Sequence, residues 1–370
     1  MGSKRQMLKN GLGDFLNDEI SGRKRFVDLF CGSAAVTWHV AQRYSVPTLA
    51  CDLQLFSVVL AEAVSSRTEV LSTVDLWSGW LESSSRYVAE RPFPLMRKMS
   101  KTLVGELRKW CKTEGQGALL VAYGGHYYSP EQATWLDAFR KNLPENPTAQ
   151  KVCLAALIIA ASKAAASPGH TAQPFQPTAT ALQYLGQSWA LNIRDLVQSA
   201  LADLVLRHAK VLGAAIVGDA NVLAEQAMDG DLVFVDPPYS GVQYSRFYHV
   251  LESIAAGDAG PVSGVGRYPV PSKRPSSDYS LKSKSESAID ALLEKLADRG
   301  AVVMLTFPDH LCSNGLSGDA IREIAAKNFK ISEKSVKSVF STLGGVSSVT
   351  AGSRKARQNA DELILRLEPI

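Results

Sequence analysis

The sequence predicts an α/β fold in which a long helical segment interrupts a sheet. Three short apolar runs have the length and side-chain character of buried strands: residues 26–30, 48–51 and 231–235. The first two are followed by helical spacing of apolar side chains at residues 34–44 and 53–63, so strand and helix alternate as in parallel α/β folds. Residues 66–205 then show a dense helical pattern and predict a helical insert.

The composition suits a globular chain with one α/β domain and a smaller second one. Of the 370 residues 46% are hydrophobic and 21% charged, and the net charge of +4 permits a polyanionic partner without requiring one. The five cysteines lack a CxxC or Cys/His ligand spacing, which argues against a disulfide framework or a zinc site and favours a cytoplasmic location. No apolar run reaches the length of a membrane span, and the N-terminus lacks a signal-peptide pattern.

The run at residues 231–235 ends in Asp236-Pro237-Pro238-Tyr239, which we predict to be a catalytic centre. The two prolines end the strand and fix an acid and an aromatic ring at its carboxyl end, where open α/β sheets bind ligands. A base amino group becomes nucleophilic when a carboxylate and a carbonyl accept hydrogen bonds from it and localise its lone pair, roles that Asp236 and the Pro237 carbonyl fit. Tyr239 offers a face on which an extruded base can stack. The alternative is an ordinary turn in which Asp236 is a cap.

Earlier and later turns predict a nucleoside pocket. The first strand runs into Cys31-Gly32-Ser33 and then a helix, which brings backbone amides and a helix N-terminus to a ligand. Asp52 follows the glycine turn by about 20 residues and ends the second strand, where an acid holds ribose hydroxyls. Asp219, after a further apolar strand, would lie over an adenine ring. Ordinary turn chemistry explains a lone glycine turn and a capping Asp219 equally well.

The helical insert has features that suit nucleic-acid binding. Its basic side chains form either a nucleic-acid cradle or a solvated face: Arg86, Arg91, Arg97, Lys98, Lys101, Arg108, Lys109 and Lys112. Two turns, residues 123–129 and 167–171, bring aromatic, Gly and His residues into loops that can stack on bases or read their edges. His170 is either such a reader or a structural hydrogen bonder. Residues 151–166 are nearly all apolar and predict a core helix.

The C-terminal part contains two candidate contact loops. Residues 260–284 predict a mobile loop that clamps phosphates or is merely disordered, with the basic side chains Arg267, Lys273, Arg274, Lys282 and Lys284. Residues 344–357 are the second such loop. Between and after them we expect one helix and two strands, at residues 285–299, 301–307 and 361–367.

Together these residues resemble the family of DNA adenine methyltransferases whose cofactor motif precedes Asp-Pro-Pro-Tyr, a group that includes Dam-like and type II restriction-modification enzymes. The resemblance spans nearly the whole chain and is carried by Gly2-Ser3-Lys4-Arg5, residues 28–32, Asp52, residues 236–239, Gln243-Tyr244, Tyr248-His249, Leu251-Glu252 and residues 305–307. The resemblance favours Gly2-Ser3-Lys4-Arg5 as part of the family pattern over a cloning remnant at the N-terminus. It implies a Rossmann-like class I methyltransferase fold with a seven-stranded sheet, a catalytic domain of residues 1–65 and 206–370, and a DNA-recognition domain of residues 66–205.

The resemblance also implies transfer of a methyl group from S-adenosylmethionine to the N6 amine of a flipped adenine in double-stranded DNA, without a metal. The catalytic residues would be Asp236, Pro237, Pro238 and Tyr239. The cofactor-binding residues would be Lys4, Asp28, Phe30, Cys31, Gly32, Asp52, Leu53, Asp219, Ala220 and Asp236. The DNA-binding residues would be Tyr244, Tyr248, His249, His170, Lys273, Arg274, Lys282 and Lys284. No nuclease motif is visible, so a restriction endonuclease or defence-system subunit would be a separate partner.

Two departures from the family pattern leave alternatives open. Ala34 stands where the family usually has a second glycine, and the helical insert precedes Asp219, whereas Dam-like enzymes carry their recognition region nearer the Asp-Pro-Pro-Tyr strand. RNA adenine or DNA cytosine N4 methyltransferases and a catalytically silent nucleic-acid-binding module are the competing hypotheses. Protein glutamine methyltransferases prefer Asn at the position of Asp236, which argues against them.

Overall fold

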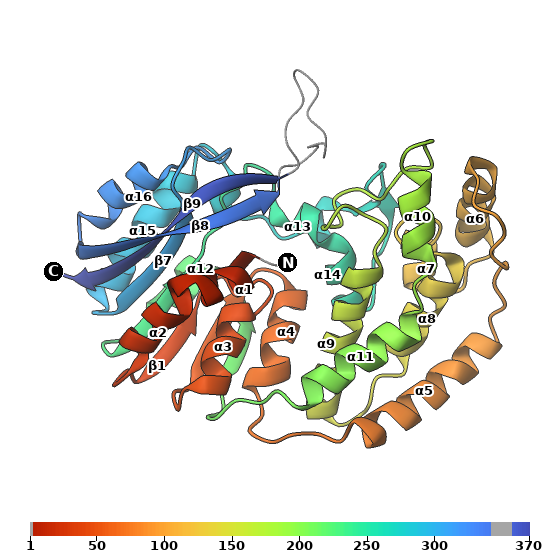
Figure 1. Cartoon of the computed structure of the whole chain (residues 1–370), viewed down its shortest axis with the longest axis horizontal. Helices are drawn as coiled ribbons and strands as arrows, with labels where there is room; N and C mark the ends of the chain where they lie inside the picture. Colours follow the sequence, from red (N-terminus) through yellow and green to blue (C-terminus); the bar gives the residue numbers. More distant parts are fainter. Residues whose placement is uncertain (1–2, 342–356) are drawn as a thin grey trace. The chain divides into compact units, whose positions relative to one another are not determined.

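The computed structural model describes residues 3–341 and 357–370 (Figure 1). The chain divides into two compact units, one of residues 1–53, 210–244 and 276–370, and one of residues 54–209 and 245–275. These bounds differ from the expected domains, because the helix after Asp52 and residues 245–275 belong to the second unit. Apart from Arg357, the candidate contact loop at residues 344–357 lies outside the described residues, as does Gly2 of the N-terminal arm.

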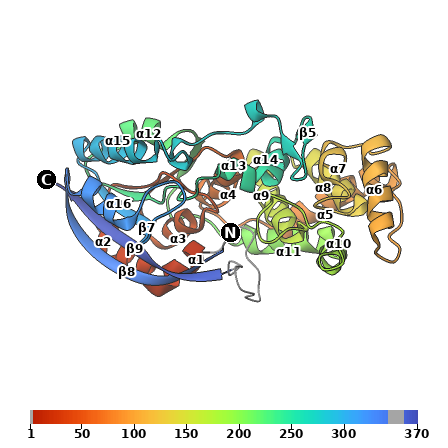
Figure 2. The same ribbon diagram turned by 90° about the horizontal axis from the view of Figure 1, so that it is seen from above.

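The first unit is built on a seven-stranded sheet with the strand order β3-β2-β1-β4-β7-β9-β8. Its strands are β1 (Arg25–Asp28), β2 (Thr48–Asp52), β3 (Ala214–Val217), β4 (Asp231–Val235), β7 (Val302–Pro308), β8 (Phe329–Ser341) and β9 (Arg357–Pro369). The strands from β3 to β7 are parallel, whereas β9 runs antiparallel to both of its neighbours. Figure 2 shows β8 and β9 as a long antiparallel pair. This mixed sheet confirms the predicted α/β class with seven strands.

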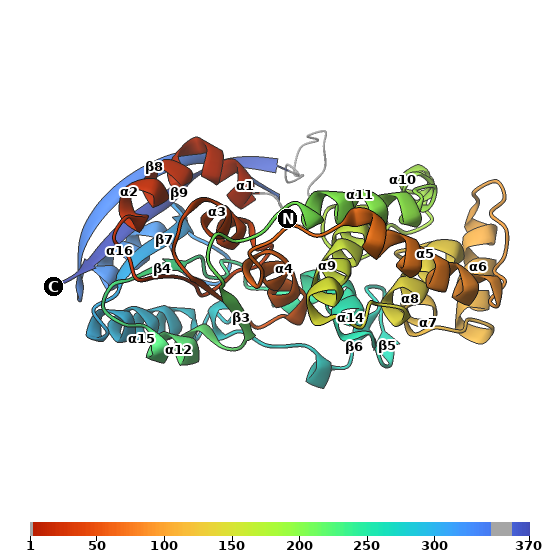
Figure 3. The ribbon, with the colours of Figure 1, turned by 90° about the horizontal axis from the view of Figure 1, so that it is seen from below.

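Side chains alternate between two cores, one on each face of the sheet. On one face Val233 and Val235 of β4 pack with α12 (Ala220–Leu223), α15 (Ser285–Asp298) and α16 (Gly318–Ala325). On the other face Leu232 and Phe234 pack with α1 (Ser3–Met7), η1 (Leu8–Leu12), α2 (Gly13–Ile20) and α3 (Ala35–Arg43). Figure 3 shows α2 and α3 on one side of the strands and α12 and α15 on the other. Because both faces of β4 are covered, the strand is apolar after Asp231, which pairs with Arg25, and its functional residues follow its end.

The second unit is mainly helical. Its helices are α4 (Leu55–Ser65), α5 (Thr73–Ala89), α6 (Lys101–Thr113), α7 (Ala118–Tyr123), α8 (Pro130–Lys141), α9 (Pro147–Ala164), α10 (Leu182–Trp189), α11 (Ile193–Val205), α13 (Tyr244–Phe247, its first residue in the first unit) and α14 (His249–Ala256). The core helix predicted over residues 151–166 is α9, which packs against α4, α8, α11 and α14. None of the helices in the described ranges is long and apolar enough to cross a membrane.

Two local expectations were wrong. Tyr123, Tyr127 and Tyr128 of the first Gly-His turn are 0% exposed, so their rings belong to the core of the second unit and cannot stack on a base. Their hydroxyls bond to Ser253 Oγ, the Thr171 carbonyl and the Ala161 carbonyl, respectively. Residues 260–284 are not a featureless loop either, since they contain β5 (Val262–Ser263), β6 (Tyr268–Pro269), η3 (Pro271–Lys273) and η4 (Asp278–Ser280).

Candidate active site

The carboxyl end of β4 places Asp236 beside two side-chain donors, Thr306 and Lys4. Thr306 Oγ1, on β7, donates to Asp236 Oδ1 at 2.9 Å, and Lys4 Nζ lies 2.9 Å from the same oxygen. No donor from the described residues binds Asp236 Oδ2. The carboxylate therefore cannot rotate freely, and its second oxygen is the one that can receive a hydrogen bond from another molecule.

Lys4 also pairs with a second acid, Glu362 of β9, at 2.5 Å from Nζ to Oε1. The side chains of Lys4 and Glu362 are only 13% and 8% exposed. Burial lowers the pKa of Lys4, but the charges of Asp236 and Glu362 outweigh it and hold the pKa above its ordinary value. Burial raises the pKa of Asp236, Lys4 opposes that rise, and Glu362 adds to it. The sequence resemblance counted Lys4 among the cofactor-binding residues, and sequence reasoning missed Glu362 altogether.

The loop after β7 holds the turn that follows Asp236. Asn314 is 0% exposed, and its Nδ2 donates to the carbonyls of Pro238 and Tyr279, each at 3.0 Å. The Ser313 hydroxyl accepts from the Gly241 amide at 2.9 Å. Nothing in the sequence around Asn314 and Ser313 marked them as supports of this turn.

The aromatic ring of the motif lies beside the core. Tyr239 packs against the core on the α15 side of the sheet, and burial raises the pKa of its hydroxyl, which therefore stays neutral. Tyr244 approaches it edge-on, with ring centroids 6.4 Å apart and an interplanar angle of 85°. The two rings are thus fixed at nearly a right angle.

The glycine turn after β1 is tied to the end of β2. The Gly32 amide donates to Asp52 Oδ2 at 2.9 Å, and the Cys31 amide donates to the Cys51 carbonyl at 2.9 Å. Ala34 stands at the start of α3 with a φ of 58°, a left-handed conformation that favours glycine. The turn forms in spite of this strain, which gives a physical reason for the glycine that the family pattern has there.

Asp28 has a buried oxygen with no partner. Its Oδ2 accepts from Thr37 Oγ1 at 2.6 Å, whereas Oδ1 is buried and lacks a hydrogen bond to any described residue. Burial raises the pKa of Asp28 to about 7, against the Thr37 hydrogen bond and with help from the charges of Asp236 and Asp52. An unsatisfied buried carboxylate oxygen is costly unless a donor, above all a cation, completes it. Asp28 therefore fits the amino group of a bound ligand.

Asp219 acts as a helix cap. Its Oδ1 accepts from the Asn221 amide at 2.8 Å, as in the turn-cap interpretation, and Asn221 in turn accepts from the Tyr279 hydroxyl at 2.6 Å. Phe30 meets the Tyr279 ring edge-on, with centroids 5.1 Å apart. The remaining members of the predicted cofactor set are buried, as Ala220 is, or half-buried, as Leu53 is. Phe30, Asp219 and Tyr279 thus form a connected group at the ends of β1 and β3.

Several of the predicted DNA-binding residues make contacts within the second unit that stabilise its fold. His249 is 1% exposed, and its ring nitrogens lie 3.1 Å and 2.9 Å from the carbonyls of Arg246 and Gly266. His170 Nδ1 accepts from the Ala172 amide at 3.3 Å, in agreement with the structural interpretation of this residue. The Tyr248 ring packs 5.5 Å from that of Phe56. Base contacts by these three side chains would compete with the contacts that the structure shows.

Of the five basic residues of the predicted phosphate clamp, Arg267 donates to the carbonyls of Ala122 and Val121, at 2.8 Å and 3.1 Å. The other four differ in their surroundings. Lys273 pairs with Asp258, and Lys284 pairs with Asp278 at 3.2 Å. Lys282 is exposed. Arg274 lies instead over the ring of Tyr268, with 5.7 Å from Cζ to the centroid. Of the four, only Lys282 and Arg274 have no carboxylate partner in the described part of the chain.

The fold and site define a class of protein. The strand order of the parallel sheet reverses between β1 and β4, and the antiparallel strand β9 lies next to β7. An acid, two prolines and a tyrosine follow β4 at this switch point. This is the architecture of class I methyltransferases, with the residues for an amino-group substrate at the expected strand end. A family model described as D12 class N6 adenine-specific DNA methyltransferase matches residues 1–266, and the chain belongs to this family of S-adenosylmethionine-dependent enzymes.

Curated relatives point to the same family. The chain is 24% identical over 317 residues to the type II methyltransferase M.FokI of Planomicrobium okeanokoites, which covers 82% of this chain and 43% of that protein. It is 30% identical over 103 residues to the modification methylase StsI of Streptococcus sanguinis, covering 28% of this chain and 16% of that protein. It is 39% identical over 69 residues to the modification methylase LlaI of Lactococcus lactis subsp. lactis, covering 19% of this chain and 11% of that protein. The chain thus spans less than half the length of each relative.

Proposed function

We propose that this protein transfers a methyl group from S-adenosylmethionine to the N6 amine of adenine in double-stranded DNA. The observation that carries the proposal is the geometry of Asp236, whose Oδ1 is held by Lys4 and Thr306 while Oδ2 has no donor among the described residues. Membership of the D12 family supports adenine as the base and DNA as the substrate.

The residues around β1 and β2 fit S-adenosylmethionine. Asp28 Oδ1, buried and unpartnered, would accept from the amino group of the methionine end, beside Phe30, Cys31 and Gly32. Asp52 would hold the ribose hydroxyls, and Leu53, Asp219 and Ala220 would line the adenine. When bound, the cofactor supplies a methyl group activated by a positively charged sulfur.

The protein's own part in the reaction is to prepare the amine. Asp236 Oδ2 would accept a hydrogen bond from one N–H of the N6 amine and the Pro237 carbonyl from the other, so that the lone pair is localised on the nitrogen and is no longer delocalised into the ring. Pro237 and Pro238 restrict the backbone, and Asn314 fixes the carbonyl of Pro238, so these acceptors need no reorganisation. Lys4 helps to keep Asp236 ionised, and Tyr239 would stack on the base.

The proposal extends to the substrate and its context. The helical second unit would bind the DNA duplex, as expected for the insert, and Tyr244 and Lys282 remain proposed DNA contacts. A separate restriction endonuclease or defence-system subunit would act on the same recognition sequence, as restriction-modification systems pair a methylase with a nuclease. We propose a cytoplasmic location, where DNA and cofactor meet.

Transfer of labelled methyl from S-adenosylmethionine to unmethylated duplex DNA, followed by mass analysis of the nucleosides, tests this function. We expect N6-methyladenine, lost in Asp236→Ala, while the cofactor affinity of that variant changes by less than about 1 kcal/mol because the lost contact is made to the base. N4-methylcytosine, or label in RNA alone, would assign the protein to a competing methyltransferase class. Cofactor binding without transfer to any nucleic acid would favour a silent binding module.

A further inference from the structure

Two arginines lie over one tyrosine ring in the second unit. The Cζ atoms of Arg246 and Arg274 lie 4.7 Å and 5.7 Å from the ring centroid of Tyr268. The ring itself is fixed, because its hydroxyl donates to the Ala172 carbonyl at 2.6 Å and its centroid lies 4.9 Å from that of the tilted His249 ring. We call these three residues the Arg246–Tyr268–Arg274 stack. Contact with the ring limits the rotamers of both guanidinium groups and prepares them to hold a pair of anionic oxygens.

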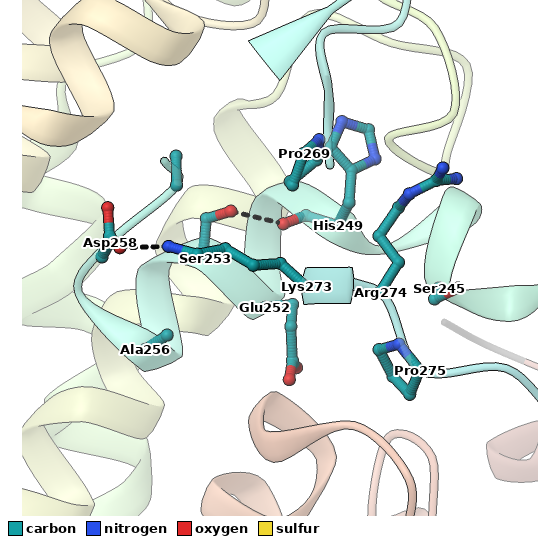
Figure 4. A pocket seen from close by; sticks show the side chains of 11 residues that line it. Ser245, His249, Glu252, Ser253, Ala256, Asp258, Pro269, Lys273, Arg274 and Pro275 are labelled. Carbon is teal, nitrogen blue, oxygen red and sulfur yellow. Dashed lines mark hydrogen bonds and ion pairs between the residues drawn. The ribbon is translucent and has the colours of Figure 1, made fainter. Parts of the chain in front are cut away.

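The stack lacks a compensating acid. No carboxylate in the described ranges pairs with Arg246 or Arg274, and Arg274 Nε is buried without a hydrogen-bond partner. The neighbouring Lys273 contrasts with this, since its ammonium group pairs with Asp258. Figure 4 shows Lys273 extended toward Asp258 and Arg274 turned away from it. Of these two adjacent basic residues, Lys273 is therefore neutralised, whereas Arg274 is available to an anion.

The two arginines also act on the buried ring of His249. Burial lowers the pKa of His249 to about 4; contacts with the carbonyls of Arg246 and Gly266 oppose this, and the charges of Arg274 and Arg246 lower it further. A concave pocket of about 360 Å³ lies alongside, and its lining includes the bases Lys273 and Arg274 and the acids Glu252 and Asp258. Asp258 pairs with Lys273 and Glu252 accepts from the amides of Leu55 and Phe56, so both acids are engaged by groups other than Arg274.

We propose that the Arg246–Tyr268–Arg274 stack is a binding site for backbone phosphates of the nucleic-acid substrate, with both guanidinium groups directed at phosphate and Lys273 excluded from the contact. The inference rests on the proposed function, which supplies the nucleic acid. Guanidinium forks match phosphate geometry, and such contacts fix the position of a protein on the duplex without reading its sequence. Arg246 is thus added to the phosphate clamp that the sequence predicted, and Lys273 is removed from it.

Binding of fluorescent duplex DNA to the full chain at several salt concentrations tests the site. Each phosphate contact contributes about 0.9 to the slope of log affinity against log salt. We expect Arg246→Gln and Arg274→Gln each to reduce the slope by roughly 0.9 and to weaken binding equally for duplexes of different sequence. Lys273→Gln, the matched control next to Arg274, should leave the slope unchanged.

Several outcomes would overturn the inference. An unchanged slope in both arginine variants, an equal effect of Lys273→Gln, or a loss confined to one DNA sequence would each contradict it, provided that the cofactor affinity shows the variants to be folded. Binding of inorganic phosphate to the wild type that is lost in the arginine variants, while their salt slope for DNA is unchanged, would assign the stack to free phosphate and overturn the inference as well.

The two proposals fail in different ways. Methylation of DNA by the wild type with no change of slope in the variants would refute the stack and leave the function standing. A slope that depends on Arg246 and Arg274, without methyl transfer to any nucleic acid, would refute the function and leave the stack standing.

Discussion

Replacement of Lys4 by Met should destabilise the protein in a pH-dependent way. Lys4 is the cation between two buried acids, at 2.9 Å from Asp236 and 2.5 Å from Glu362. At an effective dielectric constant of about 20, each contact contributes roughly 6 kcal/mol of gross attraction, against a burial penalty of several kcal/mol per ion. Since removal of one partner leaves buried charge uncompensated, we expect Lys4→Met to lower the free energy of unfolding by about 3–5 kcal/mol at pH 8.

The sign of the pH dependence follows from the two acids. Without Lys4 the pKa of Asp236 rises further above its value in the unfolded chain, which is about 4. Between these two pKa values the folded variant binds more protons than the unfolded chain, so its stability falls as the pH rises. The loss caused by Lys4→Met should therefore be smaller at pH 5 than at pH 8. The acid limb of the pH profile of kcat/KM should also move to higher pH, because Asp236 without Lys4 becomes ionised only at a higher pH.

Urea unfolding at pH 5 and pH 8 and the pH profile of methyl transfer measure these effects. Lys4→Arg should restore the acid limb, because the charge is retained, and Arg5→Met, which changes an exposed neighbour, should match the wild type. Equal stability losses at both pH values, or an unmoved acid limb in a folded Lys4→Met protein, would refute the role of Lys4 in keeping Asp236 ionised.

Three further predictions concern residues that support the site. Asn314→Asp replaces the donor to the Pro238 and Tyr279 carbonyls by an acceptor, so we expect a loss of roughly 2–4 kcal/mol in urea unfolding that grows as the pH rises above about 4, since repulsion raises the pKa of the new carboxyl group in the folded state. A pH-independent loss would contradict this. Thr37→Val removes the donor to Asp28 and should raise its pKa above about 7, so calorimetry should show weaker cofactor binding at pH 7 that recovers toward pH 9. Weakening of equal size at both pH values would count against the charge of Asp28. Ala34→Gly should stabilise the folded turn by about 1–2 kcal/mol, because glycine adopts the left-handed conformation without strain. Loss of the buried methyl group costs about 0.8 kcal/mol, and the greater freedom of the unfolded chain costs about 0.4–1 kcal/mol. Because these terms nearly cancel, the free energy of unfolding should change by less than about 1 kcal/mol.

Local patterns in the sequence were sufficient for most of the sheet. β1, β2, β4 and β7 lie close to the predicted ranges because parallel strands buried on both faces consist of apolar side chains. β8 was not predicted. It lies at the sheet edge, where Lys330, Ser332 and Glu333 break the apolar run and leave only a weak alternation. The predicted strand at residues 361–367 falls inside β9, which begins at Arg357.

The burial of loops could not be predicted from local patterns. Tyr127 and Tyr128 follow two glycines, as surface aromatics of a binding loop often do, yet both are fully buried because their hydroxyls reach backbone carbonyls far along the chain. His249 is buried in the same way. A short sequence shows the turn but not the residues that later cover it, so the aromatic or histidine character of a loop did not separate core from surface here.

The active-site support was the hardest part to predict, because it depends on contacts between distant residues. Glu362 and Lys4 are 358 positions apart and meet only because β9 lies beside β7, whose Thr306 also contacts Asp236. The single local hint was an acid at the start of the apolar run of β9. A catalytic motif can thus be found from four consecutive residues, whereas the residues that set its charge require the sheet order.

The two units carry opposite charges at their candidate sites, and this has a consequence for salt. In the first unit the candidate active site includes the acids Asp28, Asp236 and Glu362 and the cation Lys4, an acidic balance that suits a positively charged cofactor and disfavours phosphate. In the second unit no carboxylate of the described residues pairs with the Arg246–Tyr268–Arg274 stack. Buried pairs are screened little by salt, whereas contacts with a polyanion release counterions. Affinity for the cofactor should therefore change little between low and high salt, while affinity for DNA falls steeply, and equal salt dependence of the two would show that this division of charge is wrong.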